Sequence, residues 1–168
     1  MITSTAGVSV GIVTADCVPV LVAAEDGGVV GAIHAGWRGL ASGVLETGLQ
    51  AIRALAKGVD LVAAVGPAAR GCCYEVDQRV REAVAEKYSA GLDEVLIAGR
   101  RGHFQFDLAR LATWVLGQNG VDCQRIGVEN RLCTICPGDR FESYRRDGPA
   151  AGRLAHFITR PLAAPGQG

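Results

Sequence analysis

The hydrophobic period of the chain changes at Gly36, and this change constrains the fold more than any other feature. Before it, a short alternating segment at 8–12 precedes two nearly continuous apolar runs at 18–24 and 29–34. Alternation and short apolar runs are typical of β-strands. After it, apolar residues recur three or four positions apart, as in an amphipathic helix. These residues are Leu40, Val44, Leu45, Leu49, Ile52 and Leu55.

The turn between the two apolar runs, Glu25-Asp26-Gly27-Gly28, contains the Asp-Gly pair that tight hairpins favour, so the runs are expected to pair antiparallel. Asp107 is a good N-cap for a helix over 108–116. Further elements are predicted as strands at 60–66, 126–128 and 154–158 and as a helix at 76–88. Strands that alternate with helices and include a hairpin predict the α/β class, as a single-domain α/β sandwich with a mixed β-sheet flanked by helices.

The length of the chain bounds its organisation. Its 168 residues suffice for one domain with a real core and are too few for two. We therefore expect one domain over 1–160. The last eight residues, 161–168, contain two prolines and two glycines and are expected to form a flexible tail.

The charge balance excludes several classes of function. Seventeen basic and 17 acidic residues give a net charge of zero, so no global attraction to nucleic acid or to an anionic membrane is expected. No apolar run approaches the roughly 18 residues of a membrane span. The N-terminal residues do not resemble a signal peptide, which predicts a cytoplasmic protein. The six cysteines are then expected to be thiols or metal ligands.

A cysteine and a histidine lie at the ends of predicted strands. Asp16-Cys17 separates the first strand from the second, and His34 ends the third. Neighbouring strand ends can bring a thiolate and an imidazole to the same rim, and Zn²⁺ accepts such a pair, so Cys17 and His34 are candidate metal ligands. In the alternative interpretation Cys17 is a small core residue and His34 a hydrogen-bonded residue at a strand end.

Arg38 lies between two glycines directly before the predicted helix. Its guanidinium and the free N–H groups of the helix N-terminus could together hold an anion, and an ordinary surface ion pair is the alternative. The segment 141–148 is aromatic and basic, and it either lines a pocket with ring and guanidinium groups or forms a solvated loop whose arginines pair with Glu142 and Asp147. Of the other histidines, His103 is a candidate third ligand or proton carrier, whereas His156 is expected on a sheet face.

Four further cysteines form two pairs. Cys72 and Cys73 are neighbours after Gly71, and adjacent cysteines are poorly placed for an ordinary disulfide with each other. Cys133 and Cys136 have the Cys-x-x-Cys spacing of a redox or metal knuckle, but no second such pair lies at finger spacing. The sequence alone does not assign these four residues a role.

Several strings, in this order, resemble the YfiH/LACC1 family over nearly the whole chain. They are Thr14-Ala15-Asp16-Cys17-Val18-Pro19-Val20, His34-Ala35-Gly36-Trp37-Arg38-Gly39-Leu40, Gly66-Pro67, Cys72-Cys73-Tyr74-Glu75-Val76, Phe106-Asp107-Leu108, Cys133-Thr134 and Ser143-Tyr144-Arg145-Arg146-Asp147-Gly148. Members of this family were formerly described as multicopper polyphenol oxidoreductases and are now regarded as purine nucleoside phosphorylases with adenosine deaminase activity.

The resemblance implies a zinc site made by one cysteine and two histidines, of which Cys17 and His34 match two. The family's remaining histidine lies upstream of the Cys17 string, and Met1 is only sixteen positions before Cys17. We therefore expect a longer natural protein, a substitute ligand such as His103, or impaired metal binding.

The resemblance also implies the substrates, a purine nucleoside and phosphate, and leaves a homodimer open. Arg38 and Arg145 are the candidate phosphate holders. Asp16 either orients a ligand, acts as a general base, or caps a turn. Two other functions stay open: a copper-dependent phenol oxidase, which three histidines in total disfavour, and a non-catalytic metal-binding remnant.

Overall fold

The computed structural model describes residues 1–129, 132–138 and 140–162, and the strands of these segments form three sheets. The largest has the strand order β1-β4-β3-β5-β9; only its β5–β9 pair is parallel, so the sheet is mixed. Its strands are β1 (Ile2–Thr3), β3 (Val18–Ala24), β4 (Val30–Ala35), β5 (Leu61–Val65) and β9 (Ile126–Val128). The smaller sheets pair β2 (Ser9–Thr14) with β10 (Leu154–Thr159), and β8 (His103–Phe106) with both β6 (Glu75–Asp77) and β7 (Leu96–Ala98).

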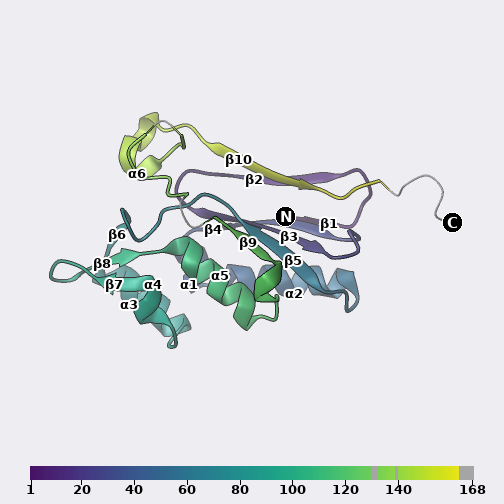
Figure 1. The fold of residues 1–168 in the computed structure, drawn as a ribbon, viewed down its shortest axis with the longest axis horizontal. Helices are drawn as coiled ribbons and strands as arrows, with labels where there is room; N and C mark the ends of the chain where they lie inside the picture. Colours follow the sequence, from purple (N-terminus) through teal and green to yellow (C-terminus); the bar gives the residue numbers. More distant parts are fainter. Residues whose placement is uncertain (130–131, 139, 163–168) are drawn as a thin grey trace.

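Helices α1 to α5 gather on one face of the large sheet, and the β2–β10 ribbon covers the other face, with α6 at one end of the ribbon (Figure 1). The apolar core between sheet and helices includes fully buried Val20, Val22, Leu45 and Leu49. Burying each such side chain contributes about 1.5–3 kcal/mol. The helices are α1 (Trp37–Ala41), α2 (Val44–Ala56), α3 (Gln78–Lys87), α4 (Leu92–Val95), α5 (Leu108–Gln118) and α6 (Tyr144–Asp147). The predicted fold class, an α/β domain with a mixed sheet and flanking helices, is confirmed.

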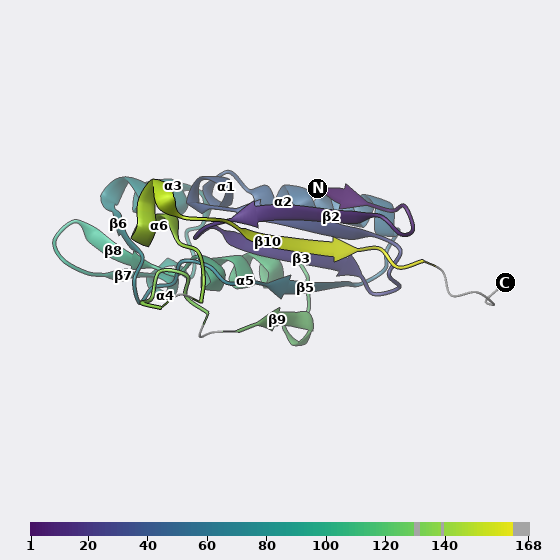
Figure 2. The same cartoon turned by 90° about the horizontal axis from the view of Figure 1, so that it is seen from above.

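The predicted hairpin is confirmed as the antiparallel pair β3–β4. In its register Val18 pairs with Ala35 and Pro19 with His34. Cys17, one residue before β3, and His34, near the end of β4, therefore lie at the same end of the sheet. α6 precedes β10 in the chain and lies at the corresponding end of the β2–β10 ribbon (Figure 2).

The predicted helix over 40–55 is wrong in one respect, because the structure divides it into α1 and α2. Gly43 lies between them with a φ of +77°, a left-handed conformation that glycine adopts at little cost. The helix predicted at 76–88 starts at Gln78, because Glu75–Asp77 pairs with β8. Asp107 is an N-cap as predicted, and its Oδ1 accepts a hydrogen bond of 2.9 Å from the Arg110 backbone N–H.

The predicted tail at 161–168 falls largely outside the described residues, which end at Leu162. Within the described part of the chain, no helix has the length and apolar character needed to cross a membrane.

Candidate active site

The residues predicted for the site come together in one place. Asp16, Cys17, His34, Arg38 and Arg145 all line one hollow of about 320 Å³. A smaller hollow of about 190 Å³ adjoins it and shares Asp16, Cys17, His34 and Arg38. The two hollows lie at the end of the sheet where β4 leads into α1, so strand register and the following helix place the site.

Cys17 lies directly against the backbone of Gly36. A Cβ atom at Gly36 would stand 2.7 Å from the Cys17 Sγ atom, which is closer than real side chains approach. The glycine in the His-Ala-Gly-Trp-Arg-Gly string is therefore a steric requirement of the thiol's position. This explains why glycine precedes α1 in this string.

The surroundings keep the Cys17 and His34 side chains in their neutral forms. Burial raises the pKa of the Cys17 thiol, and the Asp16 charge raises it further. Desolvation lowers the pKa of the His34 imidazole. A neutral imidazole is the form that binds a metal, while the thiol would give up its proton when a cation binds.

Asp16 is buried and adopts a positive φ of 89°, which is uncommon outside glycine. Its Oδ1 accepts a hydrogen bond of 2.7 Å from the Thr134 hydroxyl, and its Oδ2 accepts one of 2.6 Å from the Arg145 backbone N–H. Both carboxylate oxygens are thus engaged by the loop after β9 and by the first turn of α6. These are the contacts of a residue that positions the walls of the hollow.

The two arginines hold their guanidinium groups over aromatic rings. The Arg38 guanidinium carbon lies 4.3 Å from the Trp37 ring centroid, and that of Arg145 lies 4.8 Å from the Tyr74 centroid. Arg145 also donates a hydrogen bond of 2.9 Å to the Glu75 carbonyl oxygen. Both arginines are exposed at the hollow. They can therefore meet an anion from solvent while ring contacts limit their freedom.

The larger hollow is also lined by side chains that the sequence patterns do not single out, among them Tyr74, Tyr144 and Arg153. Tyr74 and Tyr144 supply aromatic rings, and Arg153 adds a third guanidinium. Burial raises the pKa of the Tyr74 hydroxyl. The two tyrosines lie inside recognised strings and could have been singled out, whereas no sequence signal marks Arg153.

The remaining histidines occupy different positions. His103 lines a neighbouring hollow with Glu75 and Arg100, and its Nδ1 lies 3.2 Å from the Arg101 carbonyl oxygen. Within the described residues, neither His103 nor another His, Cys, Asp or Glu completes a close three-ligand group with Cys17 and His34. His156 lies on β10, with its Nε2 at 2.9 Å from the Thr14 hydroxyl.

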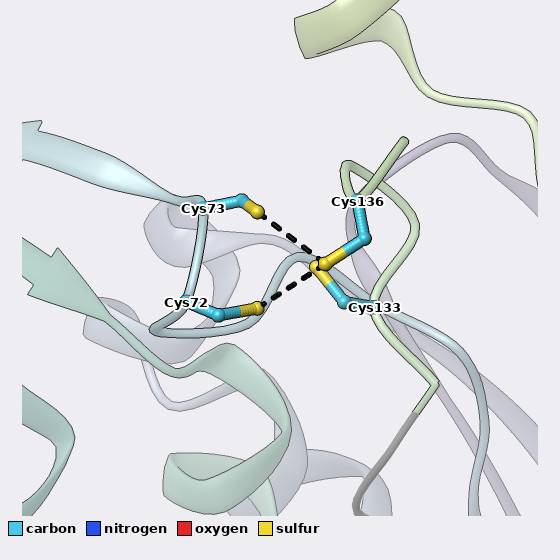
Figure 3. Close-up of side chains that lie close together, drawn as sticks. All are labelled: Cys72, Cys73, Cys133 and Cys136. Carbon is cyan, nitrogen blue, oxygen red and sulfur yellow. Dashed lines mark hydrogen bonds between the residues drawn. The ribbon is translucent and has the colours of Figure 1, made fainter. Parts of the chain in front are cut away.

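The other four cysteines converge on one another. The Sγ atoms of Cys72, Cys73, Cys133 and Cys136 all lie within 4.8 Å of each other (Figure 3). In the sequence they form two separate pairs, because the vicinal pair precedes the Cys-x-x-Cys pair by about sixty residues. Burial raises the pKa of the Cys73 thiol to about 11, and it raises that of Cys72 as well.

Fold and site together define an α/β protein in which a thiol, an imidazole and several guanidinium groups line one hollow at a sheet end. Residues 1–161 match the family model described as multi-copper polyphenol oxidoreductase laccase, and the chain belongs to this family. The predicted family resemblance is thereby confirmed.

Similar proteins carry enzyme names. The chain is 42% identical over 154 residues to a purine nucleoside phosphorylase of Xylella fastidiosa, covering 92% of this chain and 57% of that protein. It is 37% identical over 147 residues to a purine nucleoside phosphorylase of Aquifex aeolicus, covering 88% of this chain and 64% of that protein. The chain thus spans about three fifths of the length of these relatives.

Solved structures agree with this assignment. YlmD from Geobacillus stearothermophilus superposes with a TM-score of 0.87 at 34% identity, covering 95% of this chain and 60% of that one. The hypothetical protein YfiH of Bacillus licheniformis superposes with a TM-score of 0.86 at 29% identity, covering 94% and 60%. The predicted fold therefore agrees with experimental structures of similar proteins.

Proposed function

We propose that this chain carries a purine nucleoside phosphorylase site, which converts a purine nucleoside and phosphate into the free base and ribose 1-phosphate. The observation that carries the proposal is that Arg38, Arg145, Cys17 and His34 line one hollow beside aromatic rings. The names of the similar proteins support the same reaction.

Phosphate is the substrate that the two arginines fit. In phosphorolysis the glycosidic bond breaks, a phosphate oxygen bonds to the ribose carbon, and the purine leaves with a proton given up by phosphate. Guanidinium groups bind phosphate oxygens through charged, directional hydrogen bonds. Arg38 and Arg145 would hold the phosphate next to the sugar and stabilise the charge that develops as the bond breaks.

The base is proposed to lie against the aromatic rim. The Tyr144 side chain is 54% exposed and lines the same hollow as both arginines. A flat, partly exposed ring beside cationic groups suits a purine, because aromatic rings stack on its face. Asp16 supports this arrangement by holding α6, which carries Tyr144 and Arg145.

Adenosine deamination at the same hollow is the second part of the proposal, and it involves zinc. The sulfur and nitrogen donors of Cys17 and His34 match the ligands that Zn²⁺ prefers, so these two residues would hold it together with a further ligand. When bound, zinc supplies a water of lowered pKa for attack on the adenine amino carbon, which releases ammonia. The six free thiols fit action in a reducing compartment such as the cytoplasm.

Copper-dependent phenol oxidation is the second candidate, and the description of the matching family favours it. Multicopper sites rely on many imidazole ligands, and this chain has three histidines, of which His103 lines a separate hollow. We therefore rank it below phosphorolysis.

The test measures release of free base from inosine by the purified chain, with and without inorganic phosphate. We expect phosphate-dependent release, and Arg38→Gln is expected to lower kcat/KM by about 10- to 100-fold. Arg79→Gln, an exposed arginine on α3 outside the hollow, is the matched control and should leave the rate unchanged. The proposal would be refuted if base release did not depend on phosphate. It would also be refuted if the chain released no base and instead took up oxygen with a phenol in a copper-dependent reaction.

A further inference from the structure

Four thiols from two distant loops meet at a second place, outside the hollow. Cys72 and Cys73 lie in the turn before β6, and Cys133 and Cys136 lie in the loop after β9 (Figure 3). The Cys136 Sγ lies 3.6 Å from that of Cys72 and 3.4 Å from that of Cys73. None of these four residues lines either hollow of the candidate active site.

The spacing of the sulfur atoms is that of a tetrahedral metal site. A zinc–sulfur bond of about 2.3 Å places the corners of a tetrahedron about 3.8 Å apart. The observed separations of 3.4 and 3.6 Å, with all four atoms within 4.8 Å, lie close to this value. They are far longer than the roughly 2 Å of a disulfide bond, and all four cysteines are free thiols.

We propose that Cys72, Cys73, Cys133 and Cys136 bind one structural Zn²⁺, which we call the zinc clasp. A site with four protein thiolates has no open position for water or substrate, so its role is to hold structure and not to perform chemistry. The clasp is distinct from Cys17 and His34, and its existence does not depend on the proposed enzymatic reaction.

The loop that carries Cys133 and Cys136 is held by hydrogen bonds from a neighbouring arginine. The Arg146 guanidinium donates to the carbonyl oxygens of Thr134, at 2.8 Å, and Cys136, at 3.4 Å. These bonds fix the Cys-x-x-Cys loop and bring a positive charge towards a four-thiolate site that carries net negative charge.

The clasp would also hold residues that line the candidate active site. The loop with Cys133 and Cys136 is bound to the segment after β5, because the Thr134 N–H donates a hydrogen bond of 3.1 Å to the Ala68 carbonyl oxygen. The Thr134 hydroxyl donates to Asp16, which precedes Cys17 and accepts the Arg145 N–H. Tying the two loops together thus fixes Thr134, and through it Asp16 and the start of α6.

The test begins with the wild-type chain, loaded with Co²⁺ in place of zinc under reducing conditions. We expect the intense charge-transfer and ligand-field absorption of tetrahedral cobalt bound by four thiolates. Cys136→Ser should lose this spectrum, and Cys136→His should keep a bound metal with a shifted spectrum. Cys123→Ser, an exposed cysteine outside the cluster, and Cys17→Ala are the matched controls and should keep the four-thiolate spectrum.

Stability gives an independent readout. Removal of metal by a strong chelator is expected to lower the melting temperature of the wild type by about 10 °C or more, with recovery on adding zinc. Cys136→Ser should show no response to the chelator. The proposal is overturned if the metal-free reduced protein melts at the same temperature as the zinc-loaded protein. It is equally overturned if Cys136→Ser binds Co²⁺ with an unchanged spectrum, or if the cluster takes up no metal and instead forms a disulfide.

Discussion

The candidate active site and the zinc clasp each place cysteine side chains at loops that follow or precede strands, but the chain builds them differently. Cys17 and His34 line the same hollow because β3 and β4 form a hairpin, whose register is set by a short turn. The clasp thiols meet because two loops about sixty residues apart lie side by side, joined by the bridge between Ala68 and Cys133. The first arrangement is local and the second depends on the whole fold.

The two sites also differ in what their thiols face. Cys17 and His34 face a hollow that solvent and small molecules can enter. The four clasp thiols face one another, and they range from buried Cys133 to exposed Cys72. An open thiol and imidazole pair suits chemistry, whereas a closed set of four thiols suits structure. Variants of the two sites should therefore separate activity from stability.

The largest expected effect is on catalysis at the open site. Cys17→Ala or His34→Ala should reduce adenosine deamination by about 100-fold or more, since each removes a proposed zinc ligand. The melting temperature should change little, because His34 is exposed and the thiol fills little volume. Steady-state kinetics and thermal unfolding on the same samples check both expectations. Full activity in both variants would remove these residues from the site.

Gly36→Ala tests the steric link between hairpin and helix. The added Cβ would meet the Cys17 Sγ at 2.7 Å, so the thiol or the backbone must move. We expect a loss of about 1–3 kcal/mol in unfolding free energy, as for other overpacked sites, together with reduced turnover. Denaturant unfolding and kinetics measure the two effects. Gly127→Ala, where the nearest distance is 3.8 Å, is the control, and an equal loss there would contradict the steric argument.

Thr134 connects the two sites, and Thr134→Val tests this connection. It removes the hydroxyl that donates to the buried Asp16 carboxylate and should cost about 1–3 kcal/mol of stability. Thr113→Val is the matched control, because the Thr113 hydroxyl only donates to the Ala109 carbonyl of its own helix. Denaturant unfolding should show the larger loss for Thr134. Equal losses would mean that the bond to Asp16 is not a special support of the hollow.

The smallest expected effect concerns the break between α1 and α2. Gly43 has a φ of +77°, so Gly43→Ala should cost about 1 kcal/mol. Gly117→Ala, in α5 with open space around it, should instead stabilise by up to about 1 kcal/mol. Thermal unfolding of the two variants should show a lower melting temperature for Gly43→Ala and a higher one for Gly117→Ala. The same sign in both would show that the left-handed turn does not require glycine.

Much of the fold could be predicted because its patterns are local. The β3–β4 hairpin follows from apolar runs around an Asp-Gly turn, and α5 follows from apolar periodicity after Asp107. The break at Gly43 was missed, because the apolar spacing continues through it and Leu40 and Leu45 are both buried. A glycine within a periodic segment does not by itself reveal a left-handed turn.

The residues of the candidate site also differ in how far the sequence predicts them. Cys17, His34 and Arg38 could be placed together because they flank one hairpin and its following helix. Arg145 arrives from a segment more than a hundred residues later, and only the family strings pointed to it. Arg153 and the convergence of the four clasp thiols could not be predicted, because they depend on how distant loops pack.

Phosphorolysis itself is tested by base release from inosine by the wild type and by Arg38→Gln, each with and without phosphate. We expect phosphate-dependent release by the wild type and a loss of about 10- to 100-fold in the variant, which should keep its melting temperature because Arg38 is exposed. Release that does not depend on phosphate, or that is unchanged in Arg38→Gln, would show that this hollow is not a phosphorylase site.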